Sequence, residues 1–285
     1  MKGLRPMAST MNTSVGKLIT DDMCQTFQRD GAVIVRGLLE PAWLQLIADN
    51  MPDFLSHAVS QKNPTRPATD DDPCIMSSLM HQHSPTFLDF LIHSGIAEAA
   101  GILMQSASAR LFEDLLIYNR AGAEAKAQWH QDEPQWPVSG SQLSSVWFSL
   151  GAVTATTGAM RFVAGSHRGP LYVPKMPQSM LDKVAADTAL WTGGPLPDIE
   201  TQRDEHHIIV TELDPGDAVI FHPRIIHTAV GSAADSPRQT FTIRFLGDDI
   251  RWQPRQMVFH RWMLDCGLTE GDRFDHESFP LCWSQ

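Results

Sequence analysis

Cysteine is scarce in this sequence, and its cysteines form no recognisable metal or redox motif. The four cysteines are far apart and no Cys-x-x-Cys occurs; they are Cys24, Cys74, Cys266 and Cys282. A disulfide framework is therefore not expected, and isolated cysteines of this kind are usually buried, reduced thiols. This pattern predicts a cytoplasmic protein.

Long apolar runs and an excess of positive charge are also absent. No segment approaches the roughly 18 consecutive apolar residues that span a membrane. The N-terminus carries basic residues without the apolar core of a secretory signal. With 22 Lys and Arg against 33 Asp and Glu, the net charge is −11, which argues against nucleic acid or an anionic membrane as partner. A small molecule is the expected partner, and the sequence leaves monomer and homodimer open.

The remaining composition is that of a globular protein with a sizeable core, since 42% of its 285 residues are hydrophobic and 19% charged. No internal repeat is present. We expect a flexible tail over residues 1–16 and a single domain over 17–285. This domain is predicted to comprise a helical part (17–108), a β core (about 109–250) and a C-terminal extension (251–285).

Helix signals dominate the first part of the chain. Thr20 is a predicted N-cap and Gly31 a helix stop, and Pro41 begins a second apolar helical pattern. A third helical stretch covers about 85–104. Between these, residues 32–35 form a predicted strand and residues 60–75 a predicted surface loop.

Short apolar runs separated by turn residues dominate from about residue 110. Their spacing favours a β-sandwich or barrel over alternating strands and helices, so the predicted fold class is mainly β with flanking helices. The runs cover 110–118, 144–153, 159–163, 208–213, 217–221, 224–230 and 239–246. Residues 170–205, rich in proline and glycine, form a long excursion of the kind that often has a functional role.

His130 and Asp132 form the first half of a predicted metal site. In an extended chain, residues i and i+2 point to the same face, so both side chains could reach one ion. His222 and His227 are the candidates for a third ligand. Two histidines and one carboxylate form the facial triad of non-haem Fe(II) oxygenases, which leaves positions open for a bidentate co-substrate and dioxygen.

A geometric argument favours His227. If the turn at 231–237 joins two paired strands, His227 and Arg238 lie opposite one another. A planar guanidinium beside the metal suits the far carboxylate of a dicarboxylate co-substrate, and Thr240 could add a hydroxyl. Arg238, Thr240, Thr242 and Arg244 share one strand face, but Arg244 lies too far along to reach the same carboxylate and is assigned to substrate or to structural pairing. His222 is expected to be a hydrogen-bonded neighbour of the site. Arg251 and Arg255 are expected at the surface, with binding of an anionic substrate as the alternative.

Several segments together resemble the phytanoyl-CoA dioxygenase family of Fe(II)/2-oxoglutarate-dependent oxygenases. They are 31–37 (GAVIVRG), 129–137 (WHQDEPQWP), 145–150 (SVWFSL), 158–168 (GAMRFVAGSHR) and 216–217 (GD) followed by His227 and Arg238. The resemblance implies a double-stranded β-helix, or jelly roll. It implies His130, Asp132 and His227 as iron ligands, Arg238 on the C5 carboxylate of 2-oxoglutarate, and Trp147 in the co-substrate pocket.

The same resemblance implies hydroxylation of an unactivated C–H bond in a small metabolite, with release of succinate and carbon dioxide. Fe(II), 2-oxoglutarate and dioxygen are then required, and ascorbate is an expected activator in vitro. Halogenating relatives lack the carboxylate found here at Asp132. Desaturation, cyclisation and epimerisation on the same scaffold remain alternatives, as does a non-enzymatic jelly-roll protein that binds a ligand. Trp136, Gln135 and Arg244 are the predicted substrate contacts.

Overall fold

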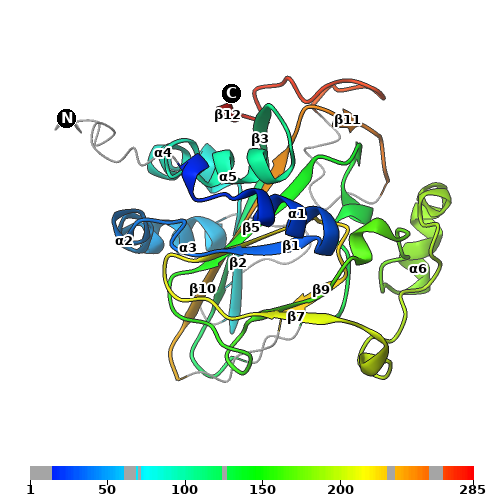
Figure 1. Ribbon diagram of the computed structural model, residues 1–285, viewed down its shortest axis with the longest axis horizontal. Helices are drawn as coiled ribbons and strands as arrows, with labels where there is room; N and C mark the ends of the chain where they lie inside the picture. Colours follow the sequence, from blue (N-terminus) through cyan, green and yellow to red (C-terminus); the bar gives the residue numbers. More distant parts are fainter. Residues whose placement is uncertain (1–14, 61–68, 70–71, 124–126, 230–234, 257–265) are drawn as a thin grey trace.

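Two antiparallel sheets face each other, and helices cover the outer face of the larger one (Figure 1). The computed structural model describes residues 15–60, 69, 72–123, 127–229, 235–256 and 266–285. The larger sheet has the strand order β1-β8-β5-β10-β3-β12, with β2 also paired to β3, and the smaller sheet has the order β7-β6-β9. The predicted mainly β, jelly-roll architecture is confirmed.

The strands agree closely with the apolar runs of the sequence. The larger sheet contains β1 (Ala32–Val35), β2 (Cys74–Ser78), β3 (Ser108–Asn119), β5 (Leu143–Ser149), β8 (Ala218–Phe221), β10 (Arg238–Leu246) and β12 (Leu281–Ser284). The smaller sheet contains β6 (Met160–Val163), β7 (Ile208–Thr211) and β9 (His227–Ala229). A separate two-stranded sheet joins β4 (Val138–Ser139) to β11 (Arg251–Trp252). The first third of the chain thus contributes two strands to the larger sheet, and β2 was not expected.

The first helix begins and ends at the predicted signals, and the second begins at Pro41 as predicted. They are α1 (Asp21–Asp30), α2 (Pro41–Asp49), α3 (Met51–Ser60), α4 (Pro85–His93) and α5 (Ile96–Leu103). The Thr20 side chain accepts a hydrogen bond from the Met23 N–H at the start of α1, and Gly31 ends it in the left-handed conformation with φ of 82°.

The helical stretch predicted over 85–104 is two helices instead of one. Gly95, with φ of 87°, separates α4 from α5, and the two axes differ by 45°. Among the described residues no single helix could cross a membrane; only this bent pair has the length and composition. Phe90, Leu91 and Ile96 of this pair are fully buried in the apolar core against the larger sheet, which identifies the pair as core helices of this fold.

Strand β10 separates an apolar core from a polar interior, as its alternating sequence predicts. Phe241, Ile243 and Phe245 face the helices, and the ring of Phe241 stacks on that of Phe148 with centroids 5.0 Å apart. The alternate residues of β10 face the space between the sheets. Burial of polar side chains there is costly unless they find partners or line a site.

The excursion at 170–205 packs against the smaller sheet and is largely helical turns. It contains α6 (Gln178–Leu181) and the 3-10 helices Asp182–Leu190 and Arg203–Glu205. Ile199 is 1% exposed and packs with Trp129 and Ile226. The excursion therefore forms one wall beside the segment that carries His130.

At its periphery the structure differs from two of the predictions. Val15 is buried and Gly16 donates to the Glu98 side chain, so the predicted flexible tail is wrong for residues 15–16, while 1–14 lie outside the described residues. Arg255 is only 4% exposed and donates to two backbone carbonyls, so its predicted surface position is also wrong. All four cysteines are described and none forms a disulfide; the cytoplasmic location stays a prediction.

Asp217 fixes the turn before β8 to the end of β1. One carboxylate oxygen accepts from the Gly37 N–H at 2.9 Å, and the other accepts from Arg36 at 2.6 Å and from the Asp214 N–H at 3.1 Å. Burial alone would raise the pKa of this carboxyl, but the hydrogen bonds and the charge of Arg36 hold the pKa below its ordinary value.

Asp217→Asn should lower the free energy of unfolding by about 1–3 kcal/mol at neutral pH. Because the folded-state pKa is depressed, the carboxylate stabilises the fold above its unfolded pKa of about 3.9 and ceases to do so as pH falls through the folded pKa. The difference from wild type should therefore shrink on acidification below about pH 4. Urea unfolding of both proteins across this range measures it, and a pH-independent difference would contradict the assignment.

Candidate metal centre

His130, Asp132 and His227 converge on one point between the sheets. One donor atom from each of the three lies within 4.8 Å of the others. Oδ1 of Asp132 is 3.4 Å from Nε2 of His130 and 3.9 Å from Nε2 of His227. These separations are shorter than two bonds of about 2.0–2.2 Å laid end to end, so a first-row metal ion fits among the three atoms.

The two histidines are placed side by side by their backbones. The His130 N–H donates to the His227 carbonyl at 3.0 Å, and the His227 N–H donates back at 2.9 Å. His227 belongs to β9, so this bridge adds His130 to the edge of the smaller sheet. The imidazole centroids are 4.3 Å apart as a result.

Asp132 reaches the site in a different way from that predicted. Its backbone is helical (φ −80°, ψ −43°) and caps the 3-10 helix Glu133–Gln135. Its N–H donates to the Pro223 carbonyl at 2.9 Å. The expectation that His130 and Asp132 lie two apart on an extended strand is therefore wrong; the chain turns after His130 and presents the carboxylate from the turn.

Hydrogen bonds fix which imidazole nitrogens are free to bind metal. Nδ1 of His130 donates to the Gln128 carbonyl at 2.7 Å, and Nδ1 of His227 donates to the Ile225 carbonyl at 2.9 Å. In both rings the lone pair is therefore on Nε2, the atom that faces Asp132. A backbone partner of this kind, which holds ring orientation and tautomer, is the usual support for a metal-binding histidine.

The charge states also suit a divalent cation. Burial and the nearby His130 lower the pKa of His227 to about 4, which keeps this imidazole neutral. Burial opposes ionisation of Asp132, but the positive charge of Arg244 holds its pKa far below the ordinary value. Burial lowers and Asp132 raises the pKa of His130, with a net increase. One anionic and two imidazole donors match the non-haem iron triad.

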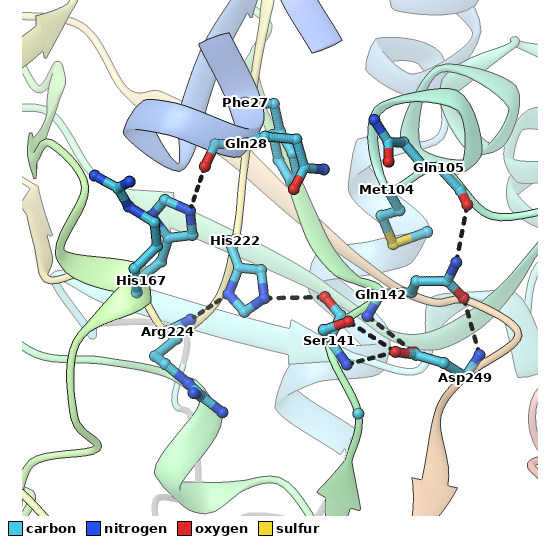
Figure 2. Close-up of a pocket in the computed structure, with 12 residues that line it drawn as sticks. Phe27, Gln28, Met104, Gln105, Ser141, Gln142, His167, His222, Arg224 and Asp249 are labelled. Carbon is cyan, nitrogen blue, oxygen red and sulfur yellow. Dashed lines mark hydrogen bonds between the residues drawn. The ribbon is translucent and has the colours of Figure 1, made fainter. Parts of the chain in front are cut away.

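His222, the other candidate for the third ligand, has both ring nitrogens occupied. Its Nδ1 accepts from the Arg224 N–H at 3.1 Å and its Nε2 donates to the Ser141 carbonyl at 3.1 Å (Figure 2). It lines a cavity of about 390 Å³ together with His167, which bonds the Gln28 carbonyl. Burial lowers the pKa of His222 to about 3. This histidine is a hydrogen-bonded structural residue, as predicted.

The predicted hairpin between His227 and Arg238 does not form, although His227 lies in the site as predicted. Strand β9 pairs with β6 in the smaller sheet, whereas β10 pairs with β3 and β5 in the larger one. The chain crosses between sheets after His227, so His227 and Arg238 do not oppose one another in a ladder. They face the same interior from opposite sides.

The residues assigned to the co-substrate all belong to the inner face of the larger sheet. Arg238 donates to the Gly158 carbonyl at 3.1 Å, and Thr240 donates to the Ile117 carbonyl at 3.3 Å. Trp147 of β5 lies opposite Thr242 of β10 and packs with the residues between the sheets. These side chains therefore line the same interior as His227.

The absence of a side chain at Gly158 provides space for the Arg238 guanidinium. Its φ of 133° is strained for any other residue, and a Cβ atom there would lie 1.8 Å from an Arg238 nitrogen. The glycine therefore leaves the room in which Arg238 lies.

A second cavity, of about 290 Å³, opens beside His130. The side chain of His130 is 37% exposed, whereas that of His227 is 4% exposed, so the metal ligands are approached from this side. The lining comprises Ala127, Gln128, Trp129, His130, Gln131, Pro134, Gln135, Tyr172, Val173, Pro174, Lys175 and Leu196. Gln135 is the one predicted substrate contact that lines this cavity.

The other two predicted substrate contacts lie in a buried network next to Asp132. Trp136 is 4% exposed and packs on Phe112 with centroids 4.9 Å apart. Arg244 lies over the Trp136 ring and donates to Asp132 and to Glu113. Neither Trp136 nor Arg244 lines the cavity beside His130.

Sequence reasoning missed two residues of the site. Gln131, between the two ligands, accepts from the Tyr172 N–H and donates to the carbonyls of Pro170 and Arg224, which joins the excursion to the metal-binding segment. Glu113 is paired with Arg244. A charged residue in the middle of an apolar strand is a signal for Glu113, but its partner depends on the β3–β10 register.

The following similarities to known proteins were found. The family model "Phytanoyl-CoA dioxygenase (PhyH)" matches residues 27–240. A Caenorhabditis elegans protein named "Probable phytanoyl-CoA dioxygenase" is 19% identical over 260 residues, 84% of this chain and 78% of that protein.

Two solved structures share the fold. One is the non-heme alpha ketoglutarate dependent carbocyclase SnoK from nogalamycin biosynthesis, with a TM-score of 0.72 and 18% identity over 93% of this chain and 97% of that chain. The other is the epimerase SnoN in complex with Fe³⁺, alpha ketoglutarate and nogalamycin RO, with a TM-score of 0.70 and 22% identity over 92% of this chain and 98% of that chain.

His227→Ala should abolish tight binding of Fe(II), because the two remaining ligands no longer form a facial triad. The matched control is His222→Gln, which keeps one donor and one acceptor at a buried histidine outside the triad. Anaerobic titration calorimetry with Fe(II) measures both variants. Wild-type affinity in His227→Ala, or loss of binding in a folded His222→Gln protein, would refute the ligand assignment.

Proposed function

The chain belongs to the phytanoyl-CoA dioxygenase family of iron- and 2-oxoglutarate-dependent oxygenases, and we propose that it hydroxylates an unactivated C–H bond of a small organic molecule. The observation that carries this proposal is the convergence of His130, Asp132 and His227 on one point in the jelly-roll interior. Three protein ligands leave room at a six-coordinate metal for a bidentate co-substrate and dioxygen.

The remaining interior residues suit 2-oxoglutarate as the co-substrate. Bound iron with 2-oxoglutarate would supply oxidation by dioxygen, with release of succinate and carbon dioxide. Arg238 presents a guanidinium, which binds a carboxylate with two parallel hydrogen bonds. The hydroxyl of Thr240 lies on the same strand face two residues away. Trp147 and Phe221 pack around this interior and exclude water from it.

Hydroxylation is favoured over halogenation because Asp132 supplies the carboxylate ligand that halogenating relatives lack. Cyclisation and epimerisation are known on this fold, since the carbocyclase and the epimerase share it. All three reactions begin with oxidation of the substrate at the same metal, so analysis of the product distinguishes them.

A test of the co-substrate assignment compares Arg238→Ala with Arg251→Ala, whose guanidinium also donates to backbone carbonyls but lies outside the interior. We expect Arg238→Ala to raise the apparent KM for 2-oxoglutarate by at least about 30-fold, because loss of a buried charge partner costs about 2 kcal/mol or more. Fe(II) affinity should stay at the wild-type value.

Succinate release with Fe(II) and ascorbate measures this effect. An unchanged KM in Arg238→Ala would contradict the role of Arg238. Absence of any Fe(II)-dependent succinate release by the wild-type protein, with a broad pool of small metabolites, would contradict the proposed function itself.

The cavity beside His130 favours a compact, largely apolar substrate with an anionic group. Trp129, Pro134, Tyr172 and Leu196 give it apolar and aromatic walls, and none of the described residues that line it is acidic. Within the described part of the chain, Lys175 is the one lysine or arginine that lines this cavity, and no carboxylate is paired with it. We propose that Lys175 binds a carboxylate of the substrate and that Gln135 adds a hydrogen bond near the metal.

Lys175→Glu should reverse the preference for substrate charge, because it places a negative group where the substrate anion binds. Small aromatic carboxylates and their matching carboxamides, tested in pairs for stimulation of succinate release, measure the preference. The carboxylates should be favoured by wild type and by the control Lys183→Glu, an exposed lysine outside the cavity. Preference for the amides in wild type would refute this substrate class.

A further inference from the structure

The two carboxylate oxygens of Asp132 have different partners. Oδ1 faces Nε2 of both histidines. Oδ2 accepts a hydrogen bond from Arg244 at 3.1 Å. One oxygen is thus presented to the metal position while the other is directed into the protein.

Arg244 is itself held in place from a second side. It donates to Oε2 of Glu113 at 2.5 Å, and the two residues are directly opposed on β10 and β3. Its guanidinium carbon lies 5.5 Å from the centre of the Trp136 ring. The side chains of Arg244, Glu113 and Asp132 are 12%, 6% and 11% exposed. The guanidinium therefore has little freedom to leave Asp132.

We propose that Arg244 is a positioning residue that limits Asp132 to coordination through one oxygen. A carboxylate is able to bind a metal through both oxygens, which would occupy a further coordination position. With Oδ2 bonded to Arg244, the protein supplies three donor atoms and three positions stay open, as a bidentate co-substrate and dioxygen require. This inference deepens the proposed function, because it concerns the same metal centre.

Glu113 has a distinct part in this arrangement. Without it, the guanidinium would be free to turn both of its prongs onto Asp132 and to compete with the metal for Oδ1. The opposed carboxylate engages one nitrogen of Arg244 and leaves the other for Oδ2. Glu113 therefore limits Arg244 to one hydrogen bond with Asp132, in addition to balancing the charge of Arg244 in the interior.

Arg244→Lys is the main test, because an ammonium on a flexible stem keeps the charge but loses the planar fork that bridges two carboxylates. The matched control is Arg224→Lys. Arg224 also pairs with a buried carboxylate, but it donates both of these hydrogen bonds to Glu133, at 2.8 and 2.5 Å, and none of them to Asp132.

The readout is the metal alone, without 2-oxoglutarate or substrate. Loss of a partner that orients a metal ligand typically costs about 10–100-fold in metal affinity. We expect this increase in the dissociation constant for Co(II) in Arg244→Lys. The visible absorption of bound Co(II), which reports coordination number, should also change. Arg224→Lys should retain the wild-type constant and spectrum.

Glu113→Gln provides a second variant should Arg244→Lys fail to fold. Its Co(II) affinity should fall as the released guanidinium competes for Asp132. A wild-type dissociation constant and spectrum in folded Arg244→Lys, or in Glu113→Gln, would overturn the proposal and leave the network a structural ion pair. Because Co(II) binding requires no turnover, this failure is distinguishable from failure of the proposed function.

Discussion

Every charged group between the two sheets must have a partner, and this requirement organises the centre of the molecule. Transfer of an unpaired carboxylate or guanidinium into the interior is costly. Asp132 and Glu113 are paired with Arg244, Glu133 is paired with Arg224, and Arg255 donates to the Glu133 and Val138 carbonyls. These contacts join the larger sheet, the segment after His130, the connection between β8 and β9, and the C-terminal extension. Asp132 is fixed by its contact with Arg244 and the two histidines by hydrogen bonds to backbone carbonyls, whereas the helices are held on the other face of the larger sheet by apolar packing.

Local sequence signals predicted most of the fold. Caps such as Thr20 and Gly31, and the alternation along β10, act over a few residues and were confirmed. The prediction of a single helix over 85–104 was wrong because Gly95 adopts a left-handed conformation. The φ angle of a glycine inside an apolar pattern cannot be read from the sequence. Strand β2 was missed because its pairing with β3 depends on a partner about 40 residues away.

The ligands of the candidate site were predictable as residue types, and the geometry that assembles them was not. Turn residues such as those at 231–237 predict a change of chain direction. They do not predict which sheet the next strand joins. In a jelly roll the chain crosses between sheets, so a hairpin was the wrong model for His227 and Arg238. The contacts of Gln131 and Glu113 could not be predicted for the same reason, since each depends on segments brought together only by the tertiary structure.

The backbone bridge between His130 and His227 has a consequence for assembly. The two residues are 97 positions apart in the sequence, so closing this contact fixes a long loop and its entropy must be offset by the rest of the fold. A partly folded chain in which β9 has not docked offers separate imidazoles without the shared point of convergence. Such a chain cannot hold a metal ion in the arrangement that the folded protein provides. Loading with metal therefore comes after the sheets have closed, and bound metal opposes their reopening because it binds the native state alone.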